Sequence, residues 1–219
     1  MMPKGKHIMI SATFTNAITN GLHAFFLFLY FAGALTRNLR KDGTFSFMLT
    51  LFFLTLFVMK LLGVYVHYYP ALGIPPPWVA ISLLTIMLNY LVTHAMEMPS
   101  MARIGVVFLS VFSAFMFISR GGFLYIALSV LAVYLICACY SRAWVRTGFL
   151  MIAGSNVAWI LARQIGNWFL GHQVPIECRY DNDIYHLLLI GSTFVLYKGI
   201  ARGDWRHPHD RFPAAREAS

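Results

Sequence analysis

The sequence predicts an all-α polytopic membrane protein, a bundle of seven transmembrane helices. Two observations lead to this class. Apolar side chains make up 59% of the 219 residues and charged side chains only 11%, whereas soluble globular domains have roughly 25% charged residues. The apolar residues also occur in runs of roughly 20, the length that crosses a hydrocarbon core of about 30 Å as a helix. The whole chain is therefore expected to be one membrane-embedded unit.

Each apolar run predicts one helix. The expected spans are 16–36, 46–67, 78–97, 104–119, 122–141, 147–170 and 184–200. The fourth and fifth are separated only by the Ser-Arg-Gly-Gly segment 119–122, where a charge and two helix breakers predict a tight turn. Without that turn the number of spans would change. Residues 1–200 are thus predicted to form one seven-helix domain, followed by a short polar cytoplasmic tail at 201–219.

The distribution of basic residues predicts the orientation. Seven spans place the termini on opposite sides, and cytoplasmic loops carry an excess of Lys and Arg. Eleven basic residues lie on the side of the C-terminus: Arg37, Arg40, Lys41, Arg103, Arg142, Arg146, Lys198, Arg202, Arg206, Arg211 and Arg216. Four lie on the other side: Lys4, Lys6, Arg120 and Arg179. We therefore expect the N-terminus outside and the C-terminus in the cytoplasm.

The same basic residues account for the formal net charge of +9. They are spread in short clusters between hydrophobic runs, which is typical of topology signals and not of a nucleic-acid-binding face. Membrane lipids, and not nucleic acid, are therefore the expected surroundings. The chain is predicted to be a multi-pass protein of a bacterial inner membrane or of a eukaryotic endomembrane or plasma membrane.

Polar side chains inside the spans are the candidate functional residues, because burying them in a bilayer is costly unless they are paired or hydrated. Helical spacing places them on common faces. The sets are Asn16, Asn20 and His23; Lys60, Gly63 and His67; Asn156, Arg163 and Asn167; and Asn182, Asp183 and His186. All four sets fall in the outer half of the predicted bundle, which requires that the first, second, sixth and seventh spans be neighbours.

Each polar residue also has a structural interpretation. The asparagines could cap a helix or join two helices, the histidines could lie at the interface, and Lys60 and Arg163 could extend toward the headgroups. Asp183 could pair with either cation. The convergence of four helices at one depth instead favours a functional polar cavity. Asn16, Asn20, Asn167 and Asn182 are its candidate substrate-lining residues.

Two five-residue segments carry a resemblance to a known family. Gly63-Val-Tyr-Val-His67 ends the second span, and Asn182-Asp-Ile-Tyr-His186 begins the seventh. Their places resemble the Ser-x-x-x-His and His-x-x-x-His motifs of the membrane hydrolase superfamily of alkaline ceramidases, progestin/adipoQ-type receptors and Per1-like proteins. Here Gly63 stands in place of the Ser, Asn182 in place of the first His, and no Asp opens the third span. The resemblance implies a seven-helix fold with a zinc site.

The residues themselves allow the same chemistry. A catalytic zinc takes three protein ligands and an open position for water, and His67, His186 and Asp183 are the candidate ligands, with His23 able to replace one of them. Zinc-bound water would attack an amide or ester carbonyl of a lipid-like substrate, and Arg163 or Lys60 would stabilise the oxyanion. Haem is the alternative cofactor, held by His23 with His67 or His186.

Two classes of function therefore remain open. One is a metal-dependent hydrolase of lipid amides or esters. The other is a non-catalytic membrane protein, either a subunit that binds partner membrane subunits or a bundle that handles small molecules or ions through Lys60, Arg163 and Asp183. The positions of His67 and His186 favour the first class. The missing Ser, Asp and His of the motifs favour the second.

Overall fold

The computed structural model describes residues 12–41, 45–68, 76–171 and 179–204. In these ranges it contains seven α-helices and no strand. The helices are α1 (Ala12–Leu39), α2 (Phe47–Tyr68), α3 (Pro76–Ala95), α4 (Ser100–Arg120), α5 (Leu124–Tyr140), α6 (Ala143–Leu170) and α7 (Asp181–Ala201). Each predicted span therefore corresponds to one helix. The tail beyond residue 204 lies outside the described residues.

The turn between α4 and α5 is where the sequence predicts it. Gly121 and Gly122 have φ values of 69° and 90°, in a region that residues with a side chain rarely adopt. The Gly121 N–H donates to the carbonyl of Phe117 at 2.9 Å and closes the last turn of α4. The chain then reverses into α5, so the two apolar runs are separate helices.

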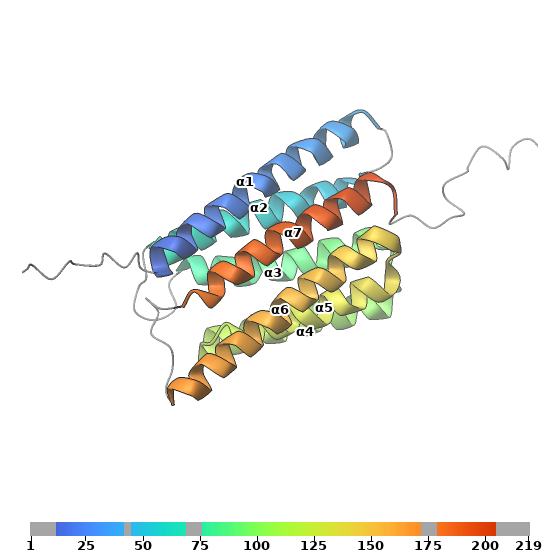
Figure 1. The fold of residues 1–219 in the computed structure, drawn as a ribbon. Helices are drawn as coiled ribbons and strands as arrows, with labels where there is room; N and C mark the ends of the chain where they lie inside the picture. The colour runs from blue at the N-terminus through green and yellow to red at the C-terminus, as the bar shows by residue number, and fades with distance from the viewer. Residues whose placement is uncertain (1–11, 42–44, 69–75, 172–178, 205–219) are drawn as a thin grey trace, which may run out of the picture.

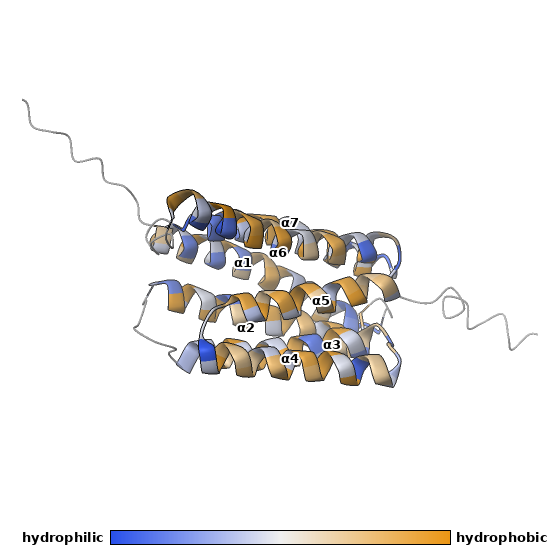
Figure 2. Cartoon of the chain, turned by 90° about the horizontal axis from the view of Figure 1, so that it is seen from below, coloured by the Kyte–Doolittle hydropathy of each residue, from blue (hydrophilic) through white to orange (hydrophobic). Residues whose placement is uncertain are grey.

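The helices have the length and composition of membrane spans. Six of the seven described helices are long and apolar enough to cross a bilayer, and α5 is a shorter apolar helix of 17 residues. Hydrophobic residues cover the middle of the helices, while hydrophilic residues gather mostly toward their ends (Figure 2). The chain is therefore a helical membrane bundle.

The helices are arranged as a closed ring. Each packs against its neighbours in the sequence, and α1 also contacts α7, which closes the ring; α3 additionally contacts α5. The predicted neighbours α2, α1, α7 and α6 thus follow one another around the bundle. Helices α1 and α7 begin at one end of the bundle and end at the other (Figure 1).

The end of the bundle where α1 and α7 terminate is filled by side chains. Tyr30 of α1 and Tyr197 of α7 stack with ring centroids 4.8 Å apart, and Phe53 of α2 meets the Tyr197 ring edge-on. Helices α6 and α7 touch closely here, because a Cβ on Gly148 would lie 2.6 Å from Leu196 Cα. We call this the packed end.

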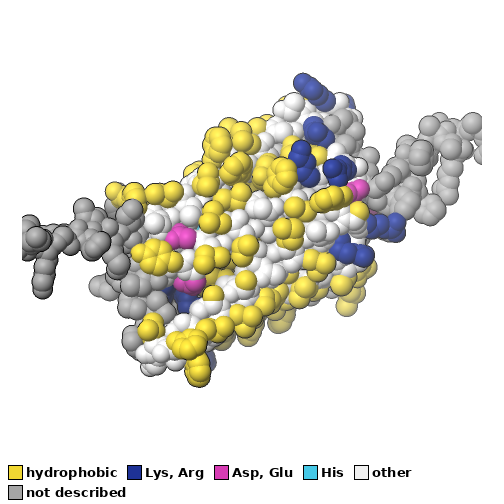
Figure 3. Space-filling view, viewed as in Figure 1, with side chains coloured by type: hydrophobic (Ala, Val, Ile, Leu, Met, Phe, Trp, Pro, Cys, Tyr) yellow, Lys and Arg dark blue, Asp and Glu magenta, His cyan; other side chains and the backbone are white. Residues whose placement is uncertain are grey.

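Basic residues also gather at the packed end (Figure 3). Those in the described residues are Arg37, Arg40, Lys41, Arg103, Arg142, Arg146, Lys198 and Arg202. Arg120, Arg163 and Arg179 lie toward the opposite end, and Lys60 lies inside α2. Lys4, Lys6, Arg206, Arg211 and Arg216 fall outside the described residues. The asymmetry of charge along the bundle axis is therefore present among the described residues alone.

Candidate functional site

A cavity of about 360 Å³ lies between the helices, toward the end at which α1 and α7 begin. Its polar lining comes from Asn20, His23, Lys60, His67, Thr85, Arg163, Arg179, Asn182, His186 and Thr193. Its aromatic lining comes from Trp78, Phe123, Tyr134, Trp159 and Tyr185. The remaining wall is mostly aliphatic, with Leu56, Ile126, Val130 and Ile152 among its residues. The cavity is thus amphipathic.

A chain of hydrogen bonds joins α2, α7 and α1 at this cavity. The Lys60 Nζ lies 3.2 Å from Nδ1 of His186, and the Asn20 amide nitrogen lies 2.8 Å from Nε2 of the same ring. Asn20 also donates to the backbone carbonyl of Asn16 at 2.9 Å. His186 is only 6% exposed and Asn20 only 2%, so these contacts hold polar groups inside the bundle, as membrane interiors require.

Gly63 makes room for this chain. A Cβ built on Gly63 would lie 2.7 Å from Asn20 Oδ1, closer than real Cβ contacts allow. The position at which the resembled motif has Ser is therefore occupied, from the side of α1, by the amide of Asn20. The replacement of the motif's Ser by Gly63 therefore leaves the space that the Asn20 side chain fills.

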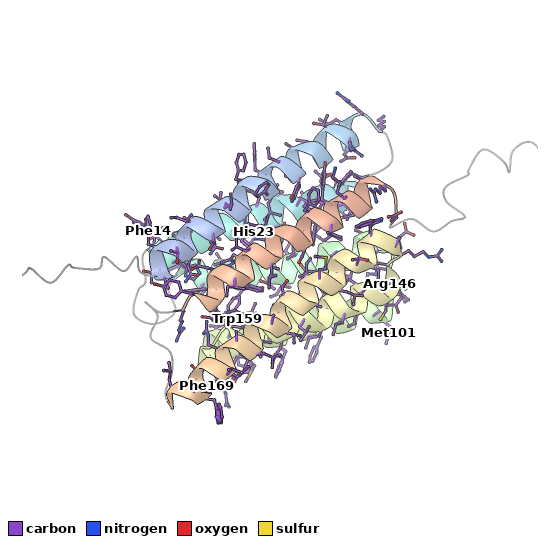
Figure 4. All side chains as sticks on the ribbon, in the orientation of Figure 1. Phe14, His23, Met101, Arg146, Trp159 and Phe169 are labelled. Carbon is purple, nitrogen blue, oxygen red and sulfur yellow. The ribbon has the colours of Figure 1, made fainter. Side chains whose placement is uncertain are left out.

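His23 lies one turn further along α1 and faces α7 (Figure 4). Its Nε2 lies 3.3 Å from the hydroxyl of Thr193, which itself donates to the carbonyl of Leu189 at 2.8 Å. The other ring nitrogen, Nδ1, is buried and has no hydrogen-bond partner among the described residues. It is therefore available to a polar group of a ligand or to a water molecule.

His67 lies across the cavity from His186. Their ring centroids are 6.2 Å apart, and the Trp78 ring lies 6.4 Å from that of His67. The two histidines of the resembled motifs are therefore brought close together. Both line the cavity.

Asp183 is directed elsewhere. It accepts hydrogen bonds from the hydroxyls of Thr15 at 2.5 Å and Thr19 at 2.9 Å, both on α1, and it does not line the cavity. Among the described residues no three His, Cys, Asp or Glu side chains form a group that could hold a metal ion. The structure thus brings His67 and His186 together but leaves Asp183 apart from them.

Arg163 pairs with Asp181 and not with Asp183. The distance between its Nη2 and Asp181 Oδ2 is 2.8 Å, and Nη2 also donates to Asn182 Oδ1 at 3.2 Å. Asp183, considered above as a partner for Arg163, does not pair with it. Asp181 and Asp183 are two residues apart on α7, so their side chains point in directions about 200° apart around the helix. Only Asp181 can face α6 while Asp183 faces α1.

The Arg163 pair is part of a junction between α6 and α7. Trp159 donates from Nε1 to Asn182 Oδ1 at 2.8 Å, and the Arg163 guanidinium lies 4.9 Å from the centroid of the Trp159 ring. Figure 4 shows Trp159 between these two helices. Arg163 and Asn182 thus line the cavity as members of a structural cluster.

The remaining predicted residues lie beside the cavity. Asn16 is buried and donates to the backbone carbonyl of Arg179 at 3.4 Å, but does not line the cavity. Asn167 is one turn beyond Arg163 on α6 and is not among the lining residues. Of the four candidate substrate-lining asparagines, Asn20 and Asn182 reach the cavity wall.

Sequence reasoning missed the aromatic side of the cavity. No aromatic residue is among the predicted cavity residues, yet Trp78, Tyr134, Trp159 and Tyr185 line the cavity. The one available signal was Tyr185, whose phenol can be polar inside a span. Its hydroxyl donates to Asn156 Oδ1 at 3.1 Å, and so its ring is fixed against the cavity.

No model of a known protein family, no curated protein and no solved structure matches this chain. The class of the protein rests on the fold and the cavity alone: it is a helical membrane bundle with an amphipathic internal cavity.

Proposed function

We propose that this protein binds a lipid-like small molecule in the cavity, without a catalytic step. The observation that carries the proposal is the lining, in which polar groups that come mostly from α1, α2 and α7 share the cavity wall with aromatic and aliphatic side chains, many of them from α3, α5 and α6. Ligand pockets of proteins are mostly apolar with a few placed polar groups, and their volumes begin at about 300 Å³. A molecule with one polar end and one apolar end complements such a wall.

The surroundings of the bundle favour a ligand that comes from the bilayer. Large apolar side chains are exposed on every helix, among them Phe25 of α1, Leu83 of α3 and Phe115 of α4. Such a surface is covered by lipid and not by water. Amphiphiles concentrated in the membrane are the molecules available to the cavity.

We further propose that the cavity lies in the outer half of the bilayer. The packed end carries most of the described basic residues, and basic loops remain cytoplasmic. The cavity is nearer the opposite end, so the N-terminus and the cavity belong to the outer side. A ligand of the outer leaflet is then the nearest one.

A zinc-dependent hydrolase, as the resemblance to the alkaline ceramidase superfamily implies, is the second candidate. The distance of 6.2 Å between the His67 and His186 ring centroids favours it, because two imidazoles on one ion must approach in this way. His23 would be the third ligand, although the described residues as they stand form no group of three such ligands. Binding without catalysis is favoured by the place of Lys60, whose amine is in contact with the His186 nitrogen that a zinc ion would need.

The test is a binding measurement on the purified chain in lipid nanodiscs, with tritiated decanol and tritiated decanoate as probes. We expect saturable binding of at least one probe. Val130→Trp fills the cavity from α5 and should abolish this binding, whereas Leu128→Trp, on the lipid-facing side of the same helix, should retain it. Thermal unfolding of both variants shows whether the bundle has remained folded.

Four results would decide against non-catalytic binding. Neither probe binding saturably to the wild type would overturn it, and so would unchanged binding to the folded Val130→Trp variant. Stoichiometric zinc in elemental analysis, lost in both His67→Ala and His186→Ala, would support the hydrolase instead. A Soret absorption band in the same preparation would indicate haem.

A further inference from the structure

The geometry points to an anionic head group on the ligand, held between the Lys60 amine and Nδ1 of His186. This inference rests on the proposed function, since it specifies the chemistry of the polar end of the lipid-like molecule. It depends on the donor and acceptor roles around His186, on the lack of a carboxylate partner for Lys60, and on the composition of the cavity wall.

The side chain of Asn20 fixes the proton on His186. Its amide nitrogen donates to the carbonyl of Asn16, which can only accept, so the amide orientation is determined. The same nitrogen lies 2.8 Å from His186 Nε2, which must then be the acceptor nitrogen of the ring. The ring proton of a neutral His186 is therefore on Nδ1.

The Nδ1 proton is directed toward the Lys60 amine, whose Nζ lies 3.2 Å from Nδ1. A neutral amine accepts this proton. An ammonium group has three donors and no acceptor, so a charged Lys60 and Nδ1 together need an acceptor from the ligand. A carboxylate has two oxygens with several lone pairs and can accept from both groups at once.

The charge of Lys60 also lacks a counterion. Among the described residues no carboxylate forms an ion pair with Lys60, and none lines the cavity. Asp181 is already paired with Arg163, and Asp183 is hydrogen-bonded to α1. The amine lies 5.8 Å from the centroid of the Tyr185 ring, a placement that suits a cation. A buried cation is costly without an anion, and a ligand can supply that anion.

The size of the cavity limits the rest of the ligand. At the roughly 30 Å³ that one water molecule occupies in the liquid, 360 Å³ corresponds to about 12 non-hydrogen atoms. Decanoate has this number and pairs a carboxylate with an alkyl chain for the apolar wall. Decanol has the same chain and a neutral head group, so the two probes differ in charge.

The experiment compares these probes in competition binding at about pH 7.5, where the fatty acid in water is ionised. Decanoate should bind to the wild type about 10- to 100-fold more tightly than decanol, the range expected for a charge-assisted hydrogen bond. Lys60→Met should remove this preference, so that decanoate and decanol bind to the variant with similar affinity. Lys198→Met removes one charge at the packed end and is the matched control, which should keep the preference. Acetate should not compete, because it lacks the apolar chain.

Equal binding of decanoate and decanol to the wild type would overturn the inference, although the proposed function would stand because both probes bind. A preference for decanoate that survives in folded Lys60→Met would also overturn it. Competition by acetate at the concentration of decanoate would assign the site to small anions and not to lipid-like molecules. Lys60→Arg keeps the charge and should retain part of the preference. If the preference is lost in Lys60→Met and retained in Lys60→Arg, the missing charge and not misfolding explains the loss.

Discussion

At the scale of single residues, Asn20 and Gly63 occupy the same small space from opposite helices. Asn20 Oδ1 contacts the Cα side of Gly63, and the Asn20 amide nitrogen is held by Asn16 and His186. The side chain therefore cannot rotate away from Gly63 without losing its hydrogen bonds. A larger residue at position 63 would displace the Asn20 side chain and so disturb its hydrogen bond to His186.

We expect Gly63→Ala to destabilise the bundle by about 1–3 kcal/mol, the usual cost of overpacking. In an Asn20→Ala background the obstructing amide is absent, and the same change at position 63 should cost less by about 1 kcal/mol. Denaturant unfolding in mixed micelles measures both. Gly191→Ala is the control, because a Cβ there has no neighbour within 4 Å. Equal costs of Gly63→Ala in the two backgrounds would contradict the steric coupling.

Individual side-chain contacts were predicted less well from the sequence than the helices were. Helical spacing placed Asn16, Asn20 and His23 on one face, and all three are buried. Spacing cannot say how a helix is rotated relative to its neighbours, and so it could not distinguish Asp181 from Asp183 as the partner of Arg163. Nor could it reveal that Gly63 was small because of Asn20, since the two residues are far apart in the sequence.

At the scale of the elements, the close packing of α6 against α7 depends on two glycines at the packed end. A Cβ on Gly148 would lie 2.6 Å from Leu196 Cα, and one on Gly199 would lie 2.6 Å from the Val145 backbone nitrogen. Both contacts are with backbone, which cannot move aside as a side chain can. Small residues allow such close approach of helices in membranes.

Gly148→Ala and Gly199→Ala should each lower the free energy of unfolding by at least about 1 kcal/mol, because the helices must separate. Gly154→Ala lies on the same helix as Gly148, but its Cβ would meet nothing within 4 Å. It should be neutral or slightly stabilising, since Ala favours helix over Gly. Denaturant unfolding of the three variants in mixed micelles provides the comparison. Equal effects of Gly148→Ala and Gly154→Ala would contradict the close contact.

The existence of the helices followed from the apolar runs, but their ends did not. Helix α1 begins at Ala12 and α6 at Ala143, four residues before the predicted spans in each case. Hydropathy marks the part of a helix inside the hydrocarbon, whereas backbone hydrogen bonding continues among headgroups and water. Thr15 and Arg146 are polar and still helical, so the pattern of apolar residues underestimates both helices.

At the scale of the whole molecule, the distribution of charge gives a testable topology. The cavity end should face the outside and the packed end the cytoplasm. Ser100 and Ser119 are exposed at the two ends of α4, and Cys can replace either with little change in shape. In a background without Cys137, Cys139 and Cys178, we expect an impermeant maleimide to label Ser119→Cys in intact cells and Ser100→Cys only after permeabilisation. The reverse pattern would contradict the orientation, and labelling of both from one side would contradict a spanning α4.

The contact between Asn20 and Gly63 also limits the order in which this protein can change during evolution. A side chain at position 63 collides with the amide that is present, so the substitution at position 20 must come first. Asn20, in turn, can be lost only when His186 finds another donor for Nε2. Substitutions at the three positions are therefore expected to appear together in homologous sequences, and a chain with Ser at position 63 should not have Asn at position 20.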